Sequence, residues 1–504
     1  MSLTCEFCVA NFGFRLLFLR VSEPPWPSLL LPRRVCFDNC VPISPARTIA
    51  FEVLRRVESE GAYASDVLHA ELGARVASDN AALATEITFG VLRWRRLLDF
   101  LLDRHLKKAT AQLDLPVALA LRMGLYQLRF LERVPARAAV NESVELVKRA
   151  RKASAASLVN AVLRRASTEA GEWPVGAATD SVERLLPAKV HLADRLGILH
   201  SHPTWLVERW LQNFGESPTL ALLKANNRTP NLTCAVHDPA RREEVFADFK
   251  KAGLHVEPGQ LLSAAFASSG GSPARTESFR KGWISIHDEA SQAIPLLLGV
   301  QPGDVVLDLC AAPGGKTSPL VRATGQSGIV VAADRHAHRL RAMRNQFERL
   351  DLDGVQIVEL DAERDLPFGR QLDRILVDAP CSGTGTLARH PEIRWRLRPE
   401  QLSEFHQLQV GILASAIKQL APGGRLVYST CSMEPEENEE VVAEALAGAP
   451  PIRRLPRDEI AKSLAPHLIP GIDPQNLVDA DGQFRTSPAA QHTDGFFAAI
   501  VEKQ

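Results

Sequence analysis

Two cysteines in the last third of the chain follow predicted strands in segments that also carry polar residues. Cys381 lies in RILVDAPCSGTG and Cys431 in RLVYSTCSMEPEEN. A lone cysteine beside a strand is usually a small buried hydrophobic residue, but two at the ends of successive strands favour chemistry. A thiolate that adds to carbon 6 of a pyrimidine makes carbon 5 nucleophilic, and a carboxyl group hydrogen-bonded to ring nitrogen 3 stabilises the developing charge. The sequence therefore predicts alkylation of a pyrimidine at carbon 5, without indicating which cysteine attacks.

A glycine-rich segment, DLCAAPGGKT, lies at the end of an earlier predicted strand, VVLDLC. Gly314 and Gly315 allow a tight turn and a close approach of backbone N–H groups to a ligand. The spacing is neither the phosphate loop G-x-x-x-x-G-K-[ST] nor G-x-G-x-x-G. Asp334, at the end of the next predicted strand, is placed to accept hydrogen bonds from ribose hydroxyls. Together they predict a nucleoside-bearing methyl donor, S-adenosylmethionine; a purely structural turn is the alternative.

The elements that must position these residues alternate between strand and helix from residue 299 onward. The strand-like runs are VVLDLC, IVVAAD, VQIVEL, RILVDAP and RLVYSTC. Such alternation predicts a parallel, doubly wound sheet whose ligands bind at the carboxyl ends of the strands. The polar residues at or beside those ends are Asp308, Asp334, Asp361, Asp378 and Cys431.

The segments before residue 299 have a different character. Residues 45–170 carry apolar residues at helical spacing, such as Ile49, Val53 and Val57, and no strand signals, which predicts an all-α domain with Asn141 capping one helix. Residues 171–189 contain the Gly/Pro-rich GEWPVGAATD and are a predicted linker. Residues 190–298 mix helical patterns with the strand-like LTCAVH and GWISIH, which predicts an α+β connecting subdomain. Residues 1–44 are interpreted as a leader or unstructured extension, and a zinc site on its cysteines is the alternative.

Composition limits the possible classes of protein. The 504 residues carry 59 basic and 59 acidic side chains, so no net charge attracts nucleic acid to the whole molecule. No run approaches the ~18 apolar residues of a membrane span, and eight cysteines do not make a disulfide framework. We predict a cytoplasmic protein without a membrane or a metal. Residues 122–165 carry ten basic and three acidic side chains, an excess of seven, which is typical either of RNA binding or of a solvated helix face.

Several motifs together resemble one enzyme family. LDLCAAPGGKT, VDAPCSGTG, RHPEIRW, YSTCS-x-x-x-EEN and TDGFF are similar to those of the Nop2/Sun (Fmu) RNA 5-methylcytosine methyltransferases, and residues 45–170 resemble the NusB-like RNA-binding fold. The resemblance covers the chain from about residue 45 to its end. It implies a multidomain protein, with an all-α NusB-like N-terminal domain and an α/β Rossmann-like, S-adenosylmethionine-dependent methyltransferase domain in residues 299–504.

The resemblance also implies a reaction and a substrate. The enzyme would methylate carbon 5 of a specific cytosine in 16S ribosomal RNA, or in an early small-subunit particle, through a covalent cysteine–cytosine intermediate, with no obligate protein partner. A tRNA cytosine-5 methyltransferase is the first alternative. A non-catalytic NusB-like RNA-binding factor is the second.

Residue roles follow from the resemblance, position by position. Cys431 would be the nucleophile, Cys381 would assist release of the product, Asp378 would contact the cytosine, and Lys316 would reach the catalytic centre. The residues expected to bind S-adenosylmethionine are Cys310, Ala311, Ala312, Pro313, Gly314, Gly315, Lys316, Asp334, Asp361 and Asp378. Candidates for substrate contact, with a surface helix or loop as the alternative, are Arg389, His390, Arg394, Trp395 and Arg396.

The chain departs from the family pattern at two places. It has Cys234-Ala235-Val236-His237 where Leu-Arg-Val-Asn is usual, and His287 where Gln precedes Asp-Glu-Ala-Ser. Both lie outside the cofactor and cysteine motifs, so they put RNA contacts in doubt more than chemistry.

Overall fold

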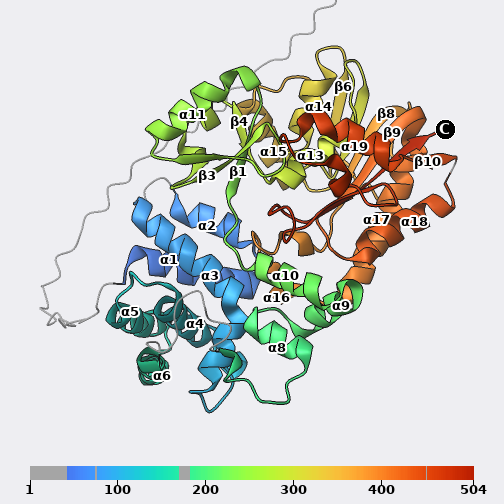
Figure 1. Cartoon of the computed structure of the whole chain (residues 1–504). Helices are drawn as coiled ribbons and strands as arrows, with labels where there is room; N and C mark the ends of the chain where they lie inside the picture. The colour runs from blue at the N-terminus through green and yellow to red at the C-terminus, as the bar shows by residue number, and fades with distance from the viewer. Residues whose placement is uncertain (1–42, 74–76, 170–181, 450) are drawn as a thin grey trace, which may run out of the picture. The chain divides into compact units, whose positions relative to one another are not determined.

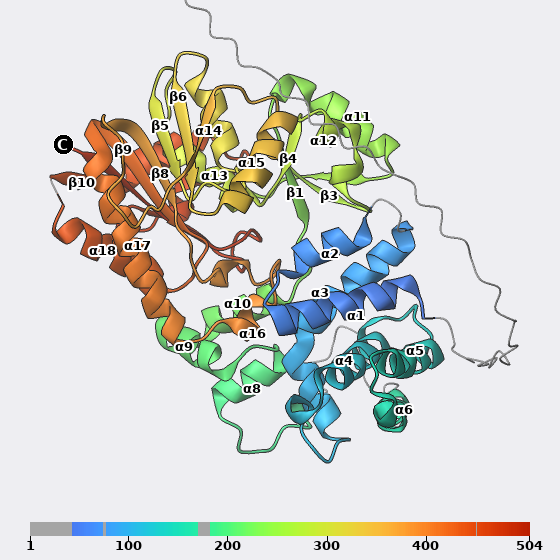
Figure 2. The ribbon, with the colours of Figure 1, turned by 180° about the vertical axis from the view of Figure 1, so that it is seen from behind.

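The computed structural model describes residues 43–73, 77–169, 182–449 and 451–504, shown from opposite sides in Figures 1 and 2. Almost all of the predicted extension 1–44 and most of the predicted linker 171–189 lie outside these ranges. Among the described residues, no helix has both the length and the apolar character needed to cross a bilayer.

The N-terminal part of the described chain is all-helical, which confirms the predicted fold class. Its helices are α1 (Pro45–Glu60), α2 (Ala64–Leu72), α3 (Ser78–Asp103), α4 (Leu115–Phe130), α5 (Ala136–Arg149) and α6 (Ala156–Glu169), with 3-10 turns at Thr110–Gln112 and Ala153–Ala155. The prediction that Asn141 caps a helix is wrong. Helix α5 begins at Ala136, after Pro135 in an extended conformation, so Asn141 lies inside the helix.

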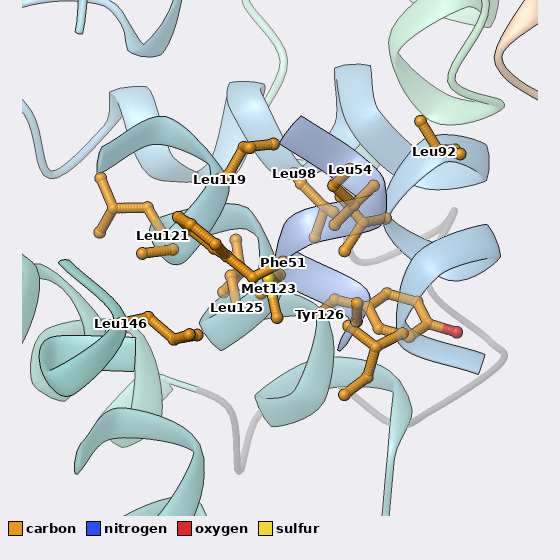
Figure 3. Close-up of a cluster of buried hydrophobic side chains, with 14 of the residues drawn as sticks. Phe51, Leu54, Leu92, Leu98, Leu119, Leu121, Met123, Leu125, Tyr126 and Leu146 are labelled. Atoms are coloured by element: carbon orange, nitrogen blue, oxygen red, sulfur yellow. The ribbon is translucent and has the colours of Figure 1, made fainter. Parts of the chain in front are cut away.

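Helix α4 is the centre of this helical domain. Nearly every residue from Val117 to Arg129 is buried, as expected for a helix that is apolar on all sides. Figure 3 shows the cluster around it, in which Phe51 and Leu54 of α1 lie beside side chains of α4. Of the residues at helical spacing in α1, Val53 and Val57 are buried, and Ile49 packs against the same core while partly exposed.

The connecting segment begins with three helices and continues as a small sheet with two helices. These elements are α8 (Leu192–Leu199), α9 (Thr204–Phe214), α10 (Glu216–Asn226), β1 (Leu232–Val236), α11 (Arg242–Lys251), β2 (His255–Pro258), β3 (Ala265–Ser269), α12 (Glu277–Arg280) and β4 (Ile284–Ile286). The sheet is antiparallel with the order β2-β3-β1-β4. The predicted strands LTCAVH and GWISIH are β1 and β4, whereas β2 and β3 had no clear sequence signal.

The C-terminal part of the chain is a mixed α/β domain. Its strands are β5 (Val305–Leu309), β6 (Ile329–Asp334), β7 (Val355–Glu359), β8 (Leu372–Asp378), β9 (Leu420–Thr430), β10 (Ile452–Arg454), β11 (Gln483–Thr486) and β12 (Phe496–Lys503). Its helices are α13 (Glu289–Leu297), α14 (Thr317–Thr324), α15 (Ala337–Arg349), α16 (Ile393–Arg396), α17 (Glu400–Gln419), α18 (Glu439–Ala447) and α19 (Arg457–Leu464).

The large sheet has the order β10-β12-β9-β8-β5-β6-β7, with β11 paired to β12. The five predicted strands β5 to β9 are parallel, and β10, β11 and β12 are added in antiparallel pairings. Strand order reverses between β5 and β8, because the chain builds β6 and β7 on one side of β5 and β8 and β9 on the other. Open α/β sheets bind ligands at such a reversal, beyond the carboxyl ends of the strands.

Alternate residues of the parallel strands enter two separate cores. Leu307 and Leu309 pack with helices α17 and α18, whereas Val306 packs with α13 and α14 on the opposite face. Helix α13 precedes residue 299, where we expected the methyltransferase domain to begin, yet its apolar side chains belong to the core of the large sheet. Helices thus cover both faces of the large sheet, and we look for a site at the carboxyl ends of its parallel strands (Figure 1).

Candidate active site

A pocket of about 230 Å³ lies at the carboxyl ends of β5, β6 and β7. Three of the residues predicted to bind the cofactor, Cys310, Asp334 and Asp361, line it. Pro380, next to Cys381, is also part of its wall. The pocket therefore lies beside the loop that carries one of the two cysteines.

The glycine-rich loop turns sharply after β5. Cys310 has a φ of 61°, and the N–H of Ala311 donates to the carbonyl of Ala333, which ties the loop to the end of β6. At Gly314, φ is 95° and an added Cβ would lie 2.6 Å from the ring of Phe347, so no other residue fits there without a shift. At Gly315 the space beside the backbone is open.

Asp334 is the buried carboxylate of the pocket. It accepts the N–H of His336 at 3.0 Å, and it pairs with Arg339 at 3.1 Å. Arg339 also donates to the carbonyl of Ala312 at 2.6 Å, so Asp334 and the glycine-rich loop share a partner. Asp361 is less buried and accepts the N–H of Glu363.

Asp308, which also ends a predicted strand, plays a different part. It is fully buried and accepts the hydroxyl hydrogen of Thr317 at 2.7 Å, at the start of α14. Burial raises its pKa to about 7. Asp308 does not line the pocket, so it anchors the helix that follows the loop.

The two cysteines face each other across the ends of β8 and β9. Their Sγ atoms are 3.2 Å apart, although the residues are separated by fifty positions in the sequence. The hydrogen bond with Cys431, together with burial, raises the pKa of the Cys381 thiol well above its usual range. Two thiols at this distance interact strongly enough that a negative charge on one disfavours ionisation of the other.

A lysine and an aspartate lie beside the thiols. Lys316 Nζ donates to Asp378 Oδ2 at 2.6 Å, and the Ser429 hydroxyl donates to Asp378 Oδ1 at 3.0 Å. Burial by itself lowers the pKa of Lys316, but the carboxylate of Asp378 and the neighbouring Cys431 raise it, and the net pKa is raised. The ammonium group is thus held charged, 5.0 Å from the centre of the Phe496 ring.

The TDGFF motif supports the loop after Cys431 through backbone contacts. Gly385 N–H donates to the carbonyl of Cys431 at 2.9 Å, and Gly495 N–H donates to the carbonyl of Gly385 at 2.8 Å. A Cβ at Gly385 would lie 2.2 Å from the Gly495 oxygen. Both motifs therefore need glycine where their backbones meet beside Cys431.

The segment from Arg389 to Arg396, where we expected substrate contact, contains side chains with structural partners. Arg394 is fully buried and donates to the carbonyls of Ser201, Asn226 and Leu387. Trp395 Nε1 donates to the carbonyl of Leu92 in α3 at 2.6 Å. These side chains join the catalytic domain to the helices that precede it.

The remaining members of that segment have similar structural partners. Arg389 pairs with Asp288 at 2.6 Å and with Asp494 at 3.0 Å. Arg396 donates to the carbonyl of Gly61, and its guanidinium lies 4.2 Å from the centre of the Tyr63 ring. His390 contacts the same Tyr63 ring edge-on. Substrate contact is therefore the wrong interpretation for Arg394, which is fully buried with its donors occupied. For the half-buried Arg389, His390, Trp395 and Arg396 it stays a prediction.

Nine of the ten basic residues of 122–165 fall into two groups, and the tenth, Lys152, is half-buried and pairs with Asp114. Arg122 is buried in ion pairs with Asp99 and Glu58, and Arg129 is buried as well. Exposed side chains remain along the loop before α5, on α5 and α6 and on the turn between them, and they are Arg133, Arg137, Lys148, Arg149, Arg151, Arg164 and Arg165. Part of the charge excess is thus structural, and the rest faces solvent.

The departures from the family pattern lie in the small sheet. Cys234 is fully buried in β1, and burial raises its pKa to about 12. His287 follows β4, where its N–H donates to the carbonyl of Thr233 and its ring lies 3.2 Å from the Ser285 hydroxyl. Burial lowers the pKa of His287 to about 3, so the ring is neutral at physiological pH.

Sequence reasoning missed several residues of the site. His336, Arg339, Leu408 and Ile412 line the pocket, the last two from helix α17. Glu437, in the EEN part of the second cysteine motif, is completely buried beneath both cysteine loops. The presence of Glu437 in a run of acids after Cys431 was the available signal, but a run of acids ordinarily indicates a solvated surface.

Three family models match the chain. The 16S rRNA methyltransferase RsmB/F model matches residues 295–502, the NusB family model matches residues 44–168, and a ferredoxin-like domain of RsmF/B-like methyltransferases matches residues 202–268. The resemblance of the helical domain to NusB is therefore confirmed.

Curated relatives cover almost the whole chain. The probable ribosomal RNA small subunit methyltransferase B of Bacillus subtilis is 32% identical over 91% of this chain and 98% of its own length. The ribosomal RNA small subunit methyltransferase B of Pseudomonas putida is 34% identical over 84% of this chain and 93% of its own length.

Solved structures share the fold. The crystal structure of PH0851 has a TM-score of 0.74 at 25% identity and covers 92% of this chain and 100% of its own. NSun6 from Pyrococcus horikoshii, with a TM-score of 0.52 at 21% identity, covers 60% of this chain and 99% of its own and shares the fold alone. The motifs, domain content and relatives agree, and the chain belongs to the RsmB/F family of S-adenosylmethionine-dependent 16S rRNA methyltransferases.

Proposed function

We propose that this protein methylates carbon 5 of a cytosine in 16S ribosomal RNA through a covalent bond between the base and Cys431. The observation that carries the proposal is the pair of thiols 3.2 Å apart beside the Lys316–Asp378 ion pair. A thiol next to a buried cation suits nucleophilic addition, and a carboxyl group next to the same cation suits recognition of a pyrimidine ring.

S-Adenosylmethionine fits the pocket beside the thiols. Asp334 is a buried carboxylate that can accept hydrogen bonds from ribose hydroxyls, and Gly314 and Gly315 bring the backbone close to a ligand. We assign binding to the loop from Cys310 to Lys316, with Asp334 and Asp361, and we place Asp378 toward the reacting end. When bound, S-adenosylmethionine supplies a methyl group that carbon 5 takes while the sulfonium sulfur keeps the bonding electron pair.

The protein's own groups perform the steps on the base. Cys431 Sγ, as a thiolate, adds to carbon 6, and the Lys316–Asp378 pair lends a proton to ring nitrogen 3, so that no negative charge builds up on the ring. After methylation, a base takes the proton on carbon 5, the Cys431 thiolate leaves carbon 6, and the proton on nitrogen 3 returns to the pair. The net release is one proton, which passes to water.

We assign removal of the carbon 5 proton to Cys381. Its pKa is raised by the hydrogen bond to Cys431 and by burial, and a negative charge on Cys431 adds to this effect. When Cys431 is bonded to carbon that charge is gone, and Cys381 loses its proton to water more easily. The thiolate of Cys381 then accepts the proton from carbon 5. The two cysteines thus differ in role because their ionisations are coupled.

RNA contact is assigned to the exposed basic side chains of the helical domain. Five exposed arginines lie in the C-terminal half of that domain, and they are Arg133, Arg137, Arg151, Arg164 and Arg165. Phosphate contacts of this kind supply affinity without choosing a base, and the target cytosine must leave its stack to reach the thiols.

The test is methyl transfer from labelled S-adenosylmethionine to RNA that lacks 5-methylcytosine, followed by separation of RNA species and digestion to nucleosides. We expect label in 5-methylcytidine from small-subunit ribosomal RNA. Label in the same nucleoside from tRNA would overturn the substrate, and label in another nucleoside would overturn the chemistry. No label from naked RNA or from early small-subunit particles, with cofactor binding demonstrated, would favour a non-catalytic RNA-binding factor.

A further inference from the structure

One buried carboxylate beneath the thiols takes no part in the steps above. Glu437 has no exposed surface, and its Oε1 accepts the N–H of Ser382 at 2.8 Å and the amide of Gln409 at 3.2 Å. Its Oε2 accepts the hydroxyl hydrogens of both Ser382 and Ser432. Four donors therefore converge on a single side chain, which is an arrangement that fixes a carboxylate in place.

Three of the four donors come from the two loops that carry the thiols, and the fourth, the Gln409 amide, lies on α17. Ser382 directly follows Cys381, and Ser432 directly follows Cys431. The two serine hydroxyls lie 3.1 Å apart over the carboxylate. Glu437 thus joins the loop after β8 to the loop after β9, one residue away from each thiol.

The two loops do not depend on Glu437 to the same degree. The Cys431 loop has other supports, since Gly385 donates to the Cys431 carbonyl, and Asn438 bonds to the Thr430 hydroxyl at 2.5 Å and to the Ser432 carbonyl at 3.0 Å. The Cys381 loop shares the Gly385 bond, and it also has the Gln409 contact to the Pro380 carbonyl at 2.9 Å and the Met433 contact to the Thr384 hydroxyl at 2.9 Å. At Ser382, next to the thiol, both the N–H and the hydroxyl bond to Glu437, whereas Ser432 gives Glu437 one bond. Loss of the carboxylate would therefore displace Cys381 more than Cys431.

We infer that Glu437 is a positioning residue that holds Cys381 at working distance from Cys431 and so controls release of the methylated product more than the first methyl transfer. This inference rests on the proposed function, in which Cys431 makes the covalent bond and Cys381 resolves it. Glu437 would thereby keep the cysteine that makes the covalent bond and the cysteine that resolves it in register.

The neighbouring charges act in the same direction. The charge of Glu437 adds to the causes that raise the pKa of Cys381, and Cys431 is among the groups that raise the pKa of Lys316. A negative group near Cys381 disfavours ionisation of its thiol, as suits a group that acts only after Cys431 has bonded to the base. Geometry and charge therefore both separate the roles of the two cysteines.

The experiment compares Glu437→Gln with the wild-type protein in single-turnover and steady-state methyl transfer. We expect the single-turnover rate to stay within about threefold, and steady-state turnover to fall by at least about tenfold, because loss of the buried acceptor acts on the release step. Denaturing gels of the variant should show protein bound to RNA. A fall in both rates together without an adduct, or no fall in either, would contradict the inference.

Two further variants keep the test decisive. Glu434→Gln removes an equally buried carboxylate from the same loop, whose side chain binds Arg209 and Trp210 and no cysteine loop. We expect this control to produce no adduct. Ser382→Ala removes one donor to Glu437 and should accumulate a smaller amount of adduct, which decides the matter if Glu437→Gln does not fold.

The same gels separate this inference from the proposed function. If Cys431→Ala still methylates RNA, the covalent mechanism fails whatever Glu437 does. If Cys381→Ala forms an adduct and neither Glu437→Gln nor Ser382→Ala does, the mechanism stands and the positioning role of Glu437 is wrong.

Discussion

Two neighbouring segments after β8 are both rich in polar residues, yet they serve different purposes. Residues 378–385 bring Asp378 and Cys381 to the Lys316 ammonium and the Cys431 thiol. In residues 389–396, Arg394 and Trp395 instead donate to the backbone carbonyls of Ser201 and Leu92, which precede the catalytic domain. The first segment is built for chemistry and the second for attachment of the catalytic domain to the rest of the chain.

The two segments show that the chemistry of a side chain does not by itself assign its role within a motif. A guanidinium in a motif of an RNA-modifying enzyme suggests phosphate contact, but Arg394 is completely buried among carbonyl acceptors. A cysteine beside a strand, by contrast, is usually a small hydrophobic residue, yet Cys381 has a chemical role in our account because the Cys431 thiol lies 3.2 Å from it. Spatial partners decide both cases.

Cys431→Ala is expected to have the greatest effect, because it removes the proposed nucleophile, whose thiol faces Cys381 of the first segment. We expect methyl transfer to fall by at least about ten-thousandfold, since Cys381, the neighbouring thiol, is assigned to proton removal and not to addition at carbon 6. Cofactor affinity, measured by calorimetry, should stay close to that of the wild-type protein, because Cys431 does not line the pocket. Retained turnover would show that Cys431 is not the nucleophile, and the chemical role assigned to the first segment would lose its basis.

Arg394→Ala tests the second segment. Removal of the guanidinium leaves several buried carbonyls without donors, at about 1–3 kcal/mol each, and it opens a cavity. We expect a clear fall in melting temperature. The exposed neighbour Arg398 provides the control, and Arg398→Ala should leave the melting temperature unchanged. A stable Arg394→Ala protein that binds RNA poorly would restore substrate contact as the role of Arg394.

Asp334→Asn sharpens the account of the cofactor pocket. A hydrogen bond to a charged group contributes about 1.5–3 kcal/mol, so affinity for S-adenosylmethionine should fall by roughly ten- to a hundredfold. Asp361→Asn, at a less buried wall of the same pocket, should have a smaller effect. Calorimetric titration of both variants provides the measurement, and equal or reversed losses would show that Asp334 is not the principal ribose contact.

Asp308→Asn is expected to have the smallest effect on methyl transfer, and its effect on the melting temperature depends on pH. Burial raises the pKa of Asp308 to about 7 in the folded state, so the folded protein keeps a proton that the unfolded chain loses near pH 4. Stability from this group is therefore full below pH 4 and is lost as pH rises toward 7. The asparagine variant, which carries no such proton, should gain melting temperature relative to wild type between pH 5 and pH 8, and a constant difference would contradict the raised pKa.

Much of the fold could be predicted from the sequence, because buried parallel strands form continuous apolar runs. The strands β5 to β9 were visible in this way, and the helices α1 and α3 were visible from apolar residues at helical spacing. Strands β2 and β3 were not, since HVEP and AFASS are short and carry polar or small residues. Their pairing with β1 depends on residues far away in the chain.

The site could be predicted only where motif residues lie at strand ends. Cys310, Asp334 and Asp361 line the pocket, and Cys381, Cys431, Asp378 and Lys316 come together as expected. Arg394 was misinterpreted because its acceptors lie up to about three hundred residues earlier, where no local pattern can indicate them. Glu437 was missed for the same reason, since its burial depends on two loops folding over it.

The central claim is that Cys431 bonds covalently to the base and that Cys381 resolves the bond. The most direct measurement is mass spectrometry of Cys381→Ala after incubation with RNA and S-adenosylmethionine and digestion with protease and nuclease. The account predicts a peptide that contains Cys431 and carries a methylated cytosine nucleotide. An unmodified Cys431 peptide, despite one round of methyl transfer to the RNA, would contradict the account.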